Sequence, residues 1–300
     1  MKQFVRLQQT IARQGKSETS FALLFRLNAK VRYAFLLVVA LLLVGCSDDD
    51  EHAEPLTQSQ AWAYLQNVWA FTIDGHECVL APSDNGSLLL RQVGDNGQEG
   101  YDTDANLLSP NEADNYVDGY LDFLNEAGTR VYYRSLTAQT VSLSLDGTTW
   151  ATARPVDAST AALTRLQAIA ILCTGYWTAE EFALPLPAEA QAREASGTLH
   201  VEYQTADNVL ALHYEEERHF TLEGEEKVDA NQWSYTNGKI EIDPNYPSEA
   251  YNNCRILFGE YGNQIIEVRD LSPAGASLTG FSYGSNFRTA KFQRSVSASR

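Results

Sequence analysis

The stretch Leu56-Thr-Gln-Ser-Gln-Ala-Trp-Ala-Tyr-Leu65 recurs later in the chain as Leu163-Thr-Arg-Leu-Gln-Ala-Ile-Ala-Ile-Leu172. The copies match at six of ten positions, and each is followed by a tryptophan, Trp69 or Trp177. Both have the spacing and composition of a short helix, with Thr57 as N-cap of the first and Ser159 or Thr160 as N-cap of the second. The recurrence predicts a duplicated unit with its break at Arg154-Pro-Val-Asp157. The alternative is a chance match among Leu, Ala and Gln.

Alternation of apolar and polar residues follows each helix and predicts strands with one buried face. In the first half these are Trp69–Ile73, Glu77–Leu80, Ser87–Val93, Gly119–Leu124, Thr129–Arg134, Val141–Leu145 and Thr149–Ala153. In the second half they are Gly197–Tyr203, Val209–Phe220, Gln232–Tyr235, Lys239–Ile242, Arg255–Gly259, Ile265–Arg269, Ala276–Tyr283 and Phe287–Gln293. Tight turns join them, so we expect a mainly β chain of two tandem antiparallel meanders, each closed into a barrel and preceded by a short helix. An immunoglobulin-like β-sandwich is the alternative.

The N-terminal region has the features of a secretory signal. An apolar run from Ala34 to Gly45 follows Lys30 and Arg32, and it is short for a membrane-spanning helix. Its end, Leu43-Val-Gly-Cys46, resembles the lipobox of bacterial lipoproteins, and the acidic run 47–51 resembles the export signal of surface lipoproteins of the Bacteroidota. The resemblance implies a lipid attached at Cys46, a membrane anchor and a place on the cell-surface side of the outer membrane. A buried core helix is the alternative.

These features divide the chain into a signal region (1–45), an acidic tether (46–55), a first β-rich domain (56–155), a second β-rich domain (156–294) and a tail (295–300). Met1 is the only methionine, and residues 1–30 precede the charged part of the signal. We therefore expect these residues to be removed, or translation to start nearer Val31.

The second half resembles the lipocalin-like domains of such surface lipoproteins over residues 163–294. It has a short helix, then Gly175-Tyr-Trp177, and later Trp233-Ser-Tyr-Thr-Asn-Gly-Lys239, which is typical of a hairpin in those domains. The first half shares only the helix and the tryptophan, and it carries an insertion between Val93 and Gly119. The resemblance implies a barrel that binds a ligand.

Charge excludes one class of partner. Seven basic residues and one acidic residue precede Cys46, which leaves 15 basic and 38 acidic side chains and a net charge of −23. Such a chain repels nucleic acid and anionic lipid.

Cysteine usage argues against a structural zinc site. With Cys46 assigned to the lipid, Cys78, Cys173 and Cys254 remain, so at most one intrachain disulfide can form. No spacing typical of a structural zinc site occurs.

A candidate calcium site lies in the insertion. Asp102, Asp104, Asn106 and Glu112 follow the ligand order of an EF-hand loop with one residue missing, the glycine of its sharp turn. The alternative is an Asx-rich turn followed by a helix with Ser109 as N-cap, Pro110 at its first position and Gly119 as its end.

A second candidate metal site is the alternating set His213, Glu215, Glu217 and His219, whose side chains share one face if the segment is a strand. The opposite face carries Leu210, Leu212, Tyr214, Phe220 and Leu222. The simpler interpretation is the solvent side of an amphipathic strand.

No hydrolase or nucleotide-binding motif occurs, and the pair Glu241 and Asp243 is a weak sign of a glycosidase. Tryptophans can stack on sugars, although Trp69 and Trp177 are expected to pack at the bases of the barrels. We expect a non-enzymatic surface lipoprotein that binds a small molecule or glycan, or that serves envelope assembly, with no cofactor except the candidate calcium. A secreted glycan hydrolase and a structural envelope or fimbrial component are the alternatives.

Overall fold

The computed structural model describes residues 55–295, except 84, 96, 98, 102–103, 158–159, 161, 183–188, 205–206, 248, 260–263 and 283–284. The predicted signal, Cys46 and the tether up to residue 54 lie outside these residues. Within the described part of the chain, no helix has both the length and the apolar character needed to cross a membrane.

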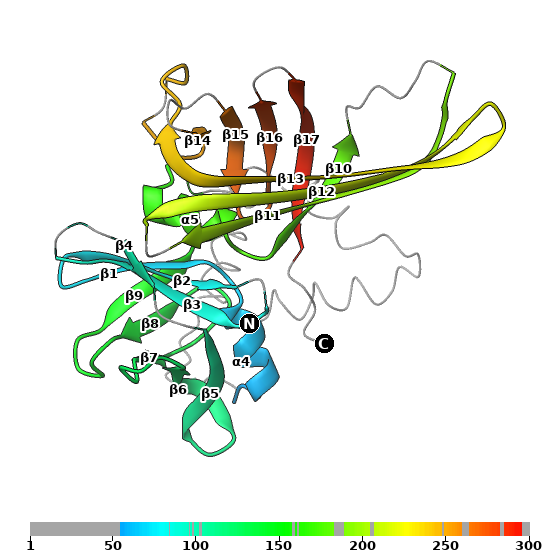
Figure 1. The fold of residues 1–300 in the computed structure, drawn as a ribbon. Coiled ribbons are helices and arrows are strands. Elements are labelled where there is room, and N and C mark those ends of the chain that lie inside the picture. The colour runs from blue at the N-terminus through cyan, green and yellow to red at the C-terminus, as the bar shows by residue number, and fades with distance from the viewer. Residues whose placement is uncertain are drawn as a thin grey trace, which may run out of the picture. The chain divides into compact units, whose positions relative to one another are not determined.

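The first half forms a closed antiparallel meander after a short helix (Figure 1). Its elements are α4 (Gln58–Leu65), β1 (Trp69–Ile73), β2 (His76–Pro82), β3 (Leu88–Val93), β4 (Glu99–Tyr101), β5 (Ala105–Glu112), β6 (Asn115–Phe123), β7 (Arg130–Arg134), β8 (Val141–Ser144) and β9 (Ala151–Pro155). Pairing of β1 with β9, and of β3 with both β2 and β5, closes a ring, and β4 pairs with residues 91–93 of β3 on the edge that also pairs with β5.

The second half repeats this plan. Its elements are α5 (Arg165–Leu172), β10 (Tyr176–Phe182), β11 (Gln191–Gln204), β12 (Val209–Leu222), β13 (Glu225–Ile242), β14 (Cys254–Phe258), β15 (Gln264–Ser272), β16 (Gly275–Ser282) and β17 (Ser285–Ser295). Each strand pairs with the next, and β10 pairs with β17 to close the barrel. The prediction of a mainly β chain with two tandem antiparallel barrel-like units, each preceded by a short helix, is confirmed.

The two helices begin and end in the same way. Thr57 and Thr164 are the N-caps, and each forms a capping box with the glutamine three residues later. The expected cap at Ser159 or Thr160 is therefore wrong, because Thr164 lies directly before the first helical residue of α5. After each helix a tryptophan donates its indole N–H to the carbonyl five residues earlier: Trp69 to Tyr64 (3.3 Å) and Trp177 to Leu172 (2.9 Å). Both rings are fully buried, as predicted.

Two local predictions were wrong. The helix expected after Ser109 is strand β5, because Ala105–Glu112 pairs with β6, and this tertiary pairing outweighs the local capping signal. The hairpin expected at residues 233–239 is a continuous part of β13. Asn237 has a positive φ of 58°, and at this point β13 changes its partner from β12 to β14. The Asn-Gly pair therefore bends one strand instead of joining two.

Helix α5 is buried on all sides. Its residues Leu166 and Ala168–Leu172 belong to the core of the second barrel, and so do Val68, Val79, Ala81 and Val156 from the first half. Strand β2 has both faces buried, since Cys78 and Leu80 belong to the core of the first barrel while Val79 and Ala81 pack in the α5 cluster. The ion pair between Arg165 and Glu99 adds a polar contact between the two halves.

Candidate functional site

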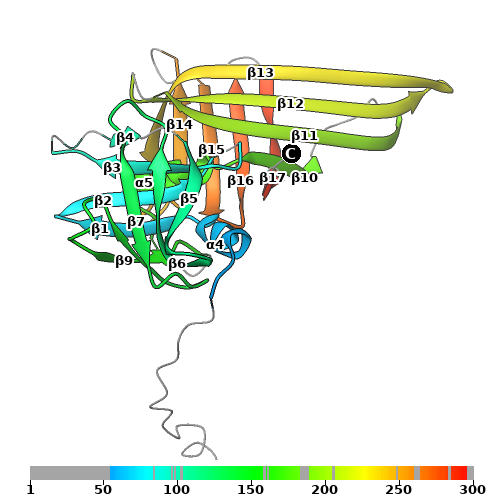
Figure 2. The same ribbon diagram turned by 90° about the horizontal axis from the view of Figure 1, so that it is seen from below.

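Strands β11, β12 and β13 are the longest of the second barrel and run past the ends of its other strands (Figures 1 and 2). Along β12, burial alternates. His213, Glu215, Glu217 and His219 lie on the outer side, and Leu210, Leu212, Tyr214, Glu216 and Arg218 are buried on the inner side. The inner face thus changes from apolar to charged along the strand.

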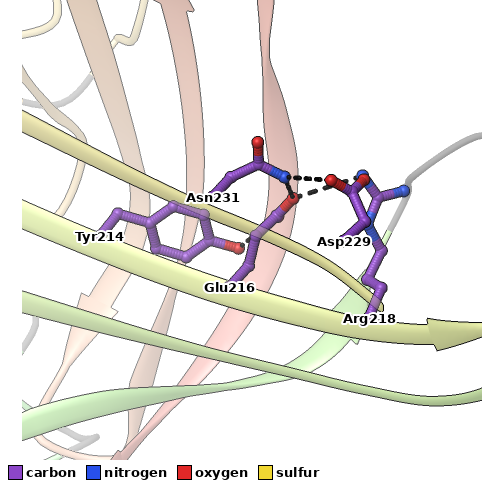
Figure 3. A network of polar contacts seen from close by, with 5 residues as sticks. All are labelled: Tyr214, Glu216, Arg218, Asp229 and Asn231. Atoms are coloured by element: carbon purple, nitrogen blue, oxygen red, sulfur yellow. Dashed lines mark hydrogen bonds and ion pairs between the residues drawn. The ribbon is translucent and has the colours of Figure 1, made fainter. Parts of the chain in front are cut away.

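A polar network connects the inner faces of β12 and β13 (Figure 3). The Glu216 side chain, which is fully buried, accepts a hydrogen bond from the Tyr214 hydroxyl (3.2 Å) on one oxygen and from Asn231 Nδ2 (3.4 Å) on the other. Arg218 Nη2 donates to Asp229 (2.6 Å) and lies 3.6 Å from Glu216. Asn231 also donates to Asp229 (3.2 Å). Arg218 therefore forms ion pairs with both carboxylates, the closer one with Asp229.

The network contains one buried donor that is not satisfied. Arg218 is 6 % exposed, and its Nε has no hydrogen-bond partner among the described residues. A buried N–H without an acceptor costs about 1–3 kcal/mol, so the arrangement favours an additional oxygen atom at this point. Asp229, whose side chain is 44 % exposed, offers an accessible acceptor beside it.

Aromatic side chains follow the polar ones along the inner face of β13. Trp233 stacks on Tyr214, with ring centroids 5.3 Å apart and planes 15° apart. The ring centroids of Tyr235 and Phe258 are also 5.3 Å apart. Trp233 and Tyr235 are both half-buried, so this face of β13 changes from the polar Asp229 and Asn231 to two aromatic rings.

A cavity of about 520 Å³ opens where β13 and β14 separate. It is lined by Ser234, Tyr235, Thr236 and Asn237 from β13, and by Phe258, Gly259 and Gln264 from the β14–β15 region.

Comparison with models of known families, with curated proteins and with solved structures found no match. The site therefore has to be interpreted from its own chemistry.

Two of the four candidate calcium ligands, Asn106 and Glu112, lie far apart in the structure. Asp102 lies outside the described residues, and Asp104 accepts a hydrogen bond from Asn85. Asn106 and Glu112 are exposed and lie six residues apart on β5, which separates them by about 20 Å in an extended strand. Those two cannot share one ion.

The other predicted residues have structural roles. His219 pairs with Glu217 (2.6 Å) on the outer face of β12, and the described residues contain no group of three or more metal-ligating side chains. Asp243 is buried beside Arg269, and Glu241 lies 3.7 Å from Arg255. Cys78, Cys173 and Cys254 are all buried.

Sequence reasoning missed Glu216, Arg218, Asp229 and Asn231. The sequence did contain a signal, because alternate residues of a strand point to the same face. Glu216 and Arg218 therefore share the face of the apolar residues Leu210, Leu212 and Tyr214. A charged pair that continues an apolar face is the sign of an interior polar site.

Proposed function

We propose that the protein is a lipid-anchored protein of the outer-membrane surface that binds a hydroxyl-bearing small molecule or glycan without catalysis. The observation that carries the proposal is the buried, unsatisfied Nε of Arg218 beside the accessible carboxylate of Asp229. The ligand site is the inner face of β12 and β13.

The chemistry of this face suits hydroxyl groups. A hydroxyl both donates and accepts, so one hydroxyl could accept from Arg218 Nε while it, or its neighbour, donates to Asp229. Trp233 and Tyr235 are placed on the same strand face, where an aromatic ring can pack against the apolar face of a sugar. Arg218 and Asp229 are already paired at 2.6 Å, so the donor and acceptor are held in place before a ligand binds.

Surface location and lipid anchoring rest on the sequence. The lipobox ending at Cys46 and the acidic run behind it support an anchored, outward-facing protein, and the excess of acidic side chains supports a solvated surface. An anchored binding protein would hold its ligand at the membrane.

A hydrolase is less well supported by the same site. Glycoside hydrolysis ordinarily needs two carboxyl groups that reach the scissile bond. Glu216 is fully buried with contacts to both oxygens, so Asp229 is the accessible carboxylate of this pair. A single reachable carboxylate suits recognition better than this chemistry.

Calorimetric titration tests the proposal with maltotriose, cellotriose, chitotriose and mannotriose as probes. We expect at least one to bind, and Arg218→Met to weaken that binding about tenfold or more. Asp229→Asn, at a half-exposed position, should weaken it with little effect on folding. Arg134→Met is the matched control, because Arg134 lies over Trp150 in the first barrel.

Two results would overturn the proposal. One is that no saccharide binds to the folded wild-type protein. The other is that Arg218→Met binds as wild type and is more stable, which would make the network a purely structural ion pair. Cleavage of a bound probe, followed by chromatography, would assign a hydrolase instead.

A further inference from the structure

Strand β13 has a long edge that no described strand covers. It pairs with β12 from Glu225 to Gly238, but with β14 only from Lys239 to Ile242. On the side away from β12, residues 225–238 therefore have no partner strand among the described residues. In an antiparallel strand, alternate residues direct both their N–H and C=O to one side, so this edge presents a row of backbone donors and acceptors.

This edge lacks the features that normally prevent pairing with another chain. Exposed edge strands commonly carry charged residues or proline where a second strand would add. Residues 230–238 read Ala-Asn-Gln-Trp-Ser-Tyr-Thr-Asn-Gly and contain neither. The charged residues of β13 lie at its two ends, on either side of this stretch.

Space is available beside the same stretch. The cavity of about 520 Å³ is lined on one side by Ser234–Asn237 of the uncovered edge and on the other by Phe258, Gly259 and Gln264. A strand added to β13 would enter this gap, where Tyr235 and Trp233 offer cross-strand neighbours to its side chains.

The charge around the edge selects the occupant. Strands β12 and β13 with their turn carry eight acidic and three basic residues. Glu215 and Glu217 are exposed on the adjacent strand. A second copy would bring two acidic hairpins together, which electrostatics disfavours, whereas a basic segment would be attracted.

We propose that residues 230–237 of β13 are a docking edge for an extended, positively charged peptide segment of another protein, which adds to the sheet as a further strand. The inference does not require the proposed ligand site, because it rests on the backbone edge of β13 and not on the side chains of Arg218 and Asp229. The two proposals share only the neighbouring rings of Trp233 and Tyr235.

The experiment follows hydrogen–deuterium exchange of the full-length protein with an eight-residue peptide of alternating lysine and valine. We expect exchange to slow in residues 230–237. A peptide N-methylated at every valine loses one row of backbone donors, so its affinity, measured by fluorescence anisotropy, should fall about tenfold or more. The charge-reversed peptide of alternating glutamate and valine should not bind.

A matched pair of variants locates the contact. Thr236→Lys places a charge on the uncovered edge and should abolish peptide binding. Thr198→Lys makes the same change in β11 at a position paired on both sides, with Thr178 and Glu215, and should bind as wild type.

Three outcomes would overturn the inference: unchanged exchange in residues 230–237, equal affinity for the N-methylated peptide, or protection that appears without peptide and grows with protein concentration. The last would show pairing between two copies. If the Thr236→Lys variant still binds a saccharide, the proposed ligand site stands even where the docking inference fails.

Discussion

The indole N–H of Trp177 donates a hydrogen bond of 2.9 Å to the carbonyl of Leu172, the last residue of α5. It satisfies one of the carbonyls that a helix leaves free at its C-terminus, and it fixes the first strand of the barrel against the helix that precedes it. Trp69 makes the corresponding bond in the first half. The connection between helix and barrel is thus similar in both halves, with the acceptor at the last residue of α5 and at the residue before the last in α4.

Trp177→Phe should lower the free energy of unfolding by about 1–3 kcal/mol, because it removes a buried hydrogen bond and part of a buried ring. Urea denaturation measures the change. Trp150→Phe is the control, since Trp150 is half-buried under Arg134, and we expect it to cost less than about 1 kcal/mol. Equal effects of the two substitutions would contradict a special role for the Trp177 bond.

Gly238→Ala should destabilise the second barrel by about 1–3 kcal/mol. A Cβ at Gly238 would lie 2.5 Å from the Phe258 ring and 2.9 Å from the Leu210 carbonyl oxygen. The backbone of β12 would have to move, and thermal unfolding should show a lower Tm. Gly100→Ala is the matched control, because its nearest atom is a carbonyl oxygen at 3.9 Å. If Gly238→Ala has the Tm of the wild type, the strand at Asn237 can shift to accept a Cβ without loss of stability, which contradicts the prediction.

The thiols should be unreactive in the folded protein. Their burial should also make the folded state less stable in alkali. Burial raises the pKa of Cys78 to about 11, with a further contribution from Glu77, and that of Cys254 to about 12. The unfolded chain, with thiol pKa values near the ordinary range, ionises first. Stability from these groups is therefore complete below about pH 9 and is lost as the pH rises through 11 to 12.

Mass spectrometry after iodoacetamide treatment at pH 8 measures this protection. We expect the peptides containing Cys78, Cys173 and Cys254 to be alkylated only after denaturation. Rapid labelling of Cys254 in the native state would be inconsistent with its burial.

Glu99→Gln should lower the free energy of unfolding by about 1–3 kcal/mol, because Glu99 is nearly buried and pairs with Arg165 at the start of α5. A double-mutant cycle with Arg165→Met should give a coupling energy of about 0.5–3 kcal/mol. Glu112→Gln, at an exposed position of β5, should change stability by no more than about 0.5 kcal/mol. A coupling energy near zero would mean that the ion pair contributes nothing between the two halves.

Local patterns predicted the fold well and the site poorly. The helices, Trp69, Trp177 and most hairpins follow from short-range spacing, so a sequence is sufficient to predict them. Strand β5 was mistaken for a capped helix because its Ser-Pro-Asn-Glu segment has strong local signals, and only pairing with β6 shows otherwise. Asn237-Gly238 was mistaken for a turn because a bend within a strand uses the same residues.

The candidate site depends on strand length and on distant neighbours. Glu216 and Arg218 stand in a run of charged residues that is typical of a solvated surface, and their burial arises only because β12 faces Asp229 and Asn231 of β13. The pairing that leaves residues 225–238 of β13 with one neighbouring strand among the described residues is equally invisible in the sequence.

Because α5 is buried in a core that includes Val68, Val79 and Ala81 of the first half, the chain cannot be divided at residue 155 without exposing apolar surface on both products. Expressed alone, the first half would carry an uncovered patch on β2, and the second half an uncovered helix. Such fragments would be expected to aggregate or to bind each other when mixed. Neither half is therefore independent of the other, and a protease cut between the halves would leave a noncovalent pair rather than two separate proteins.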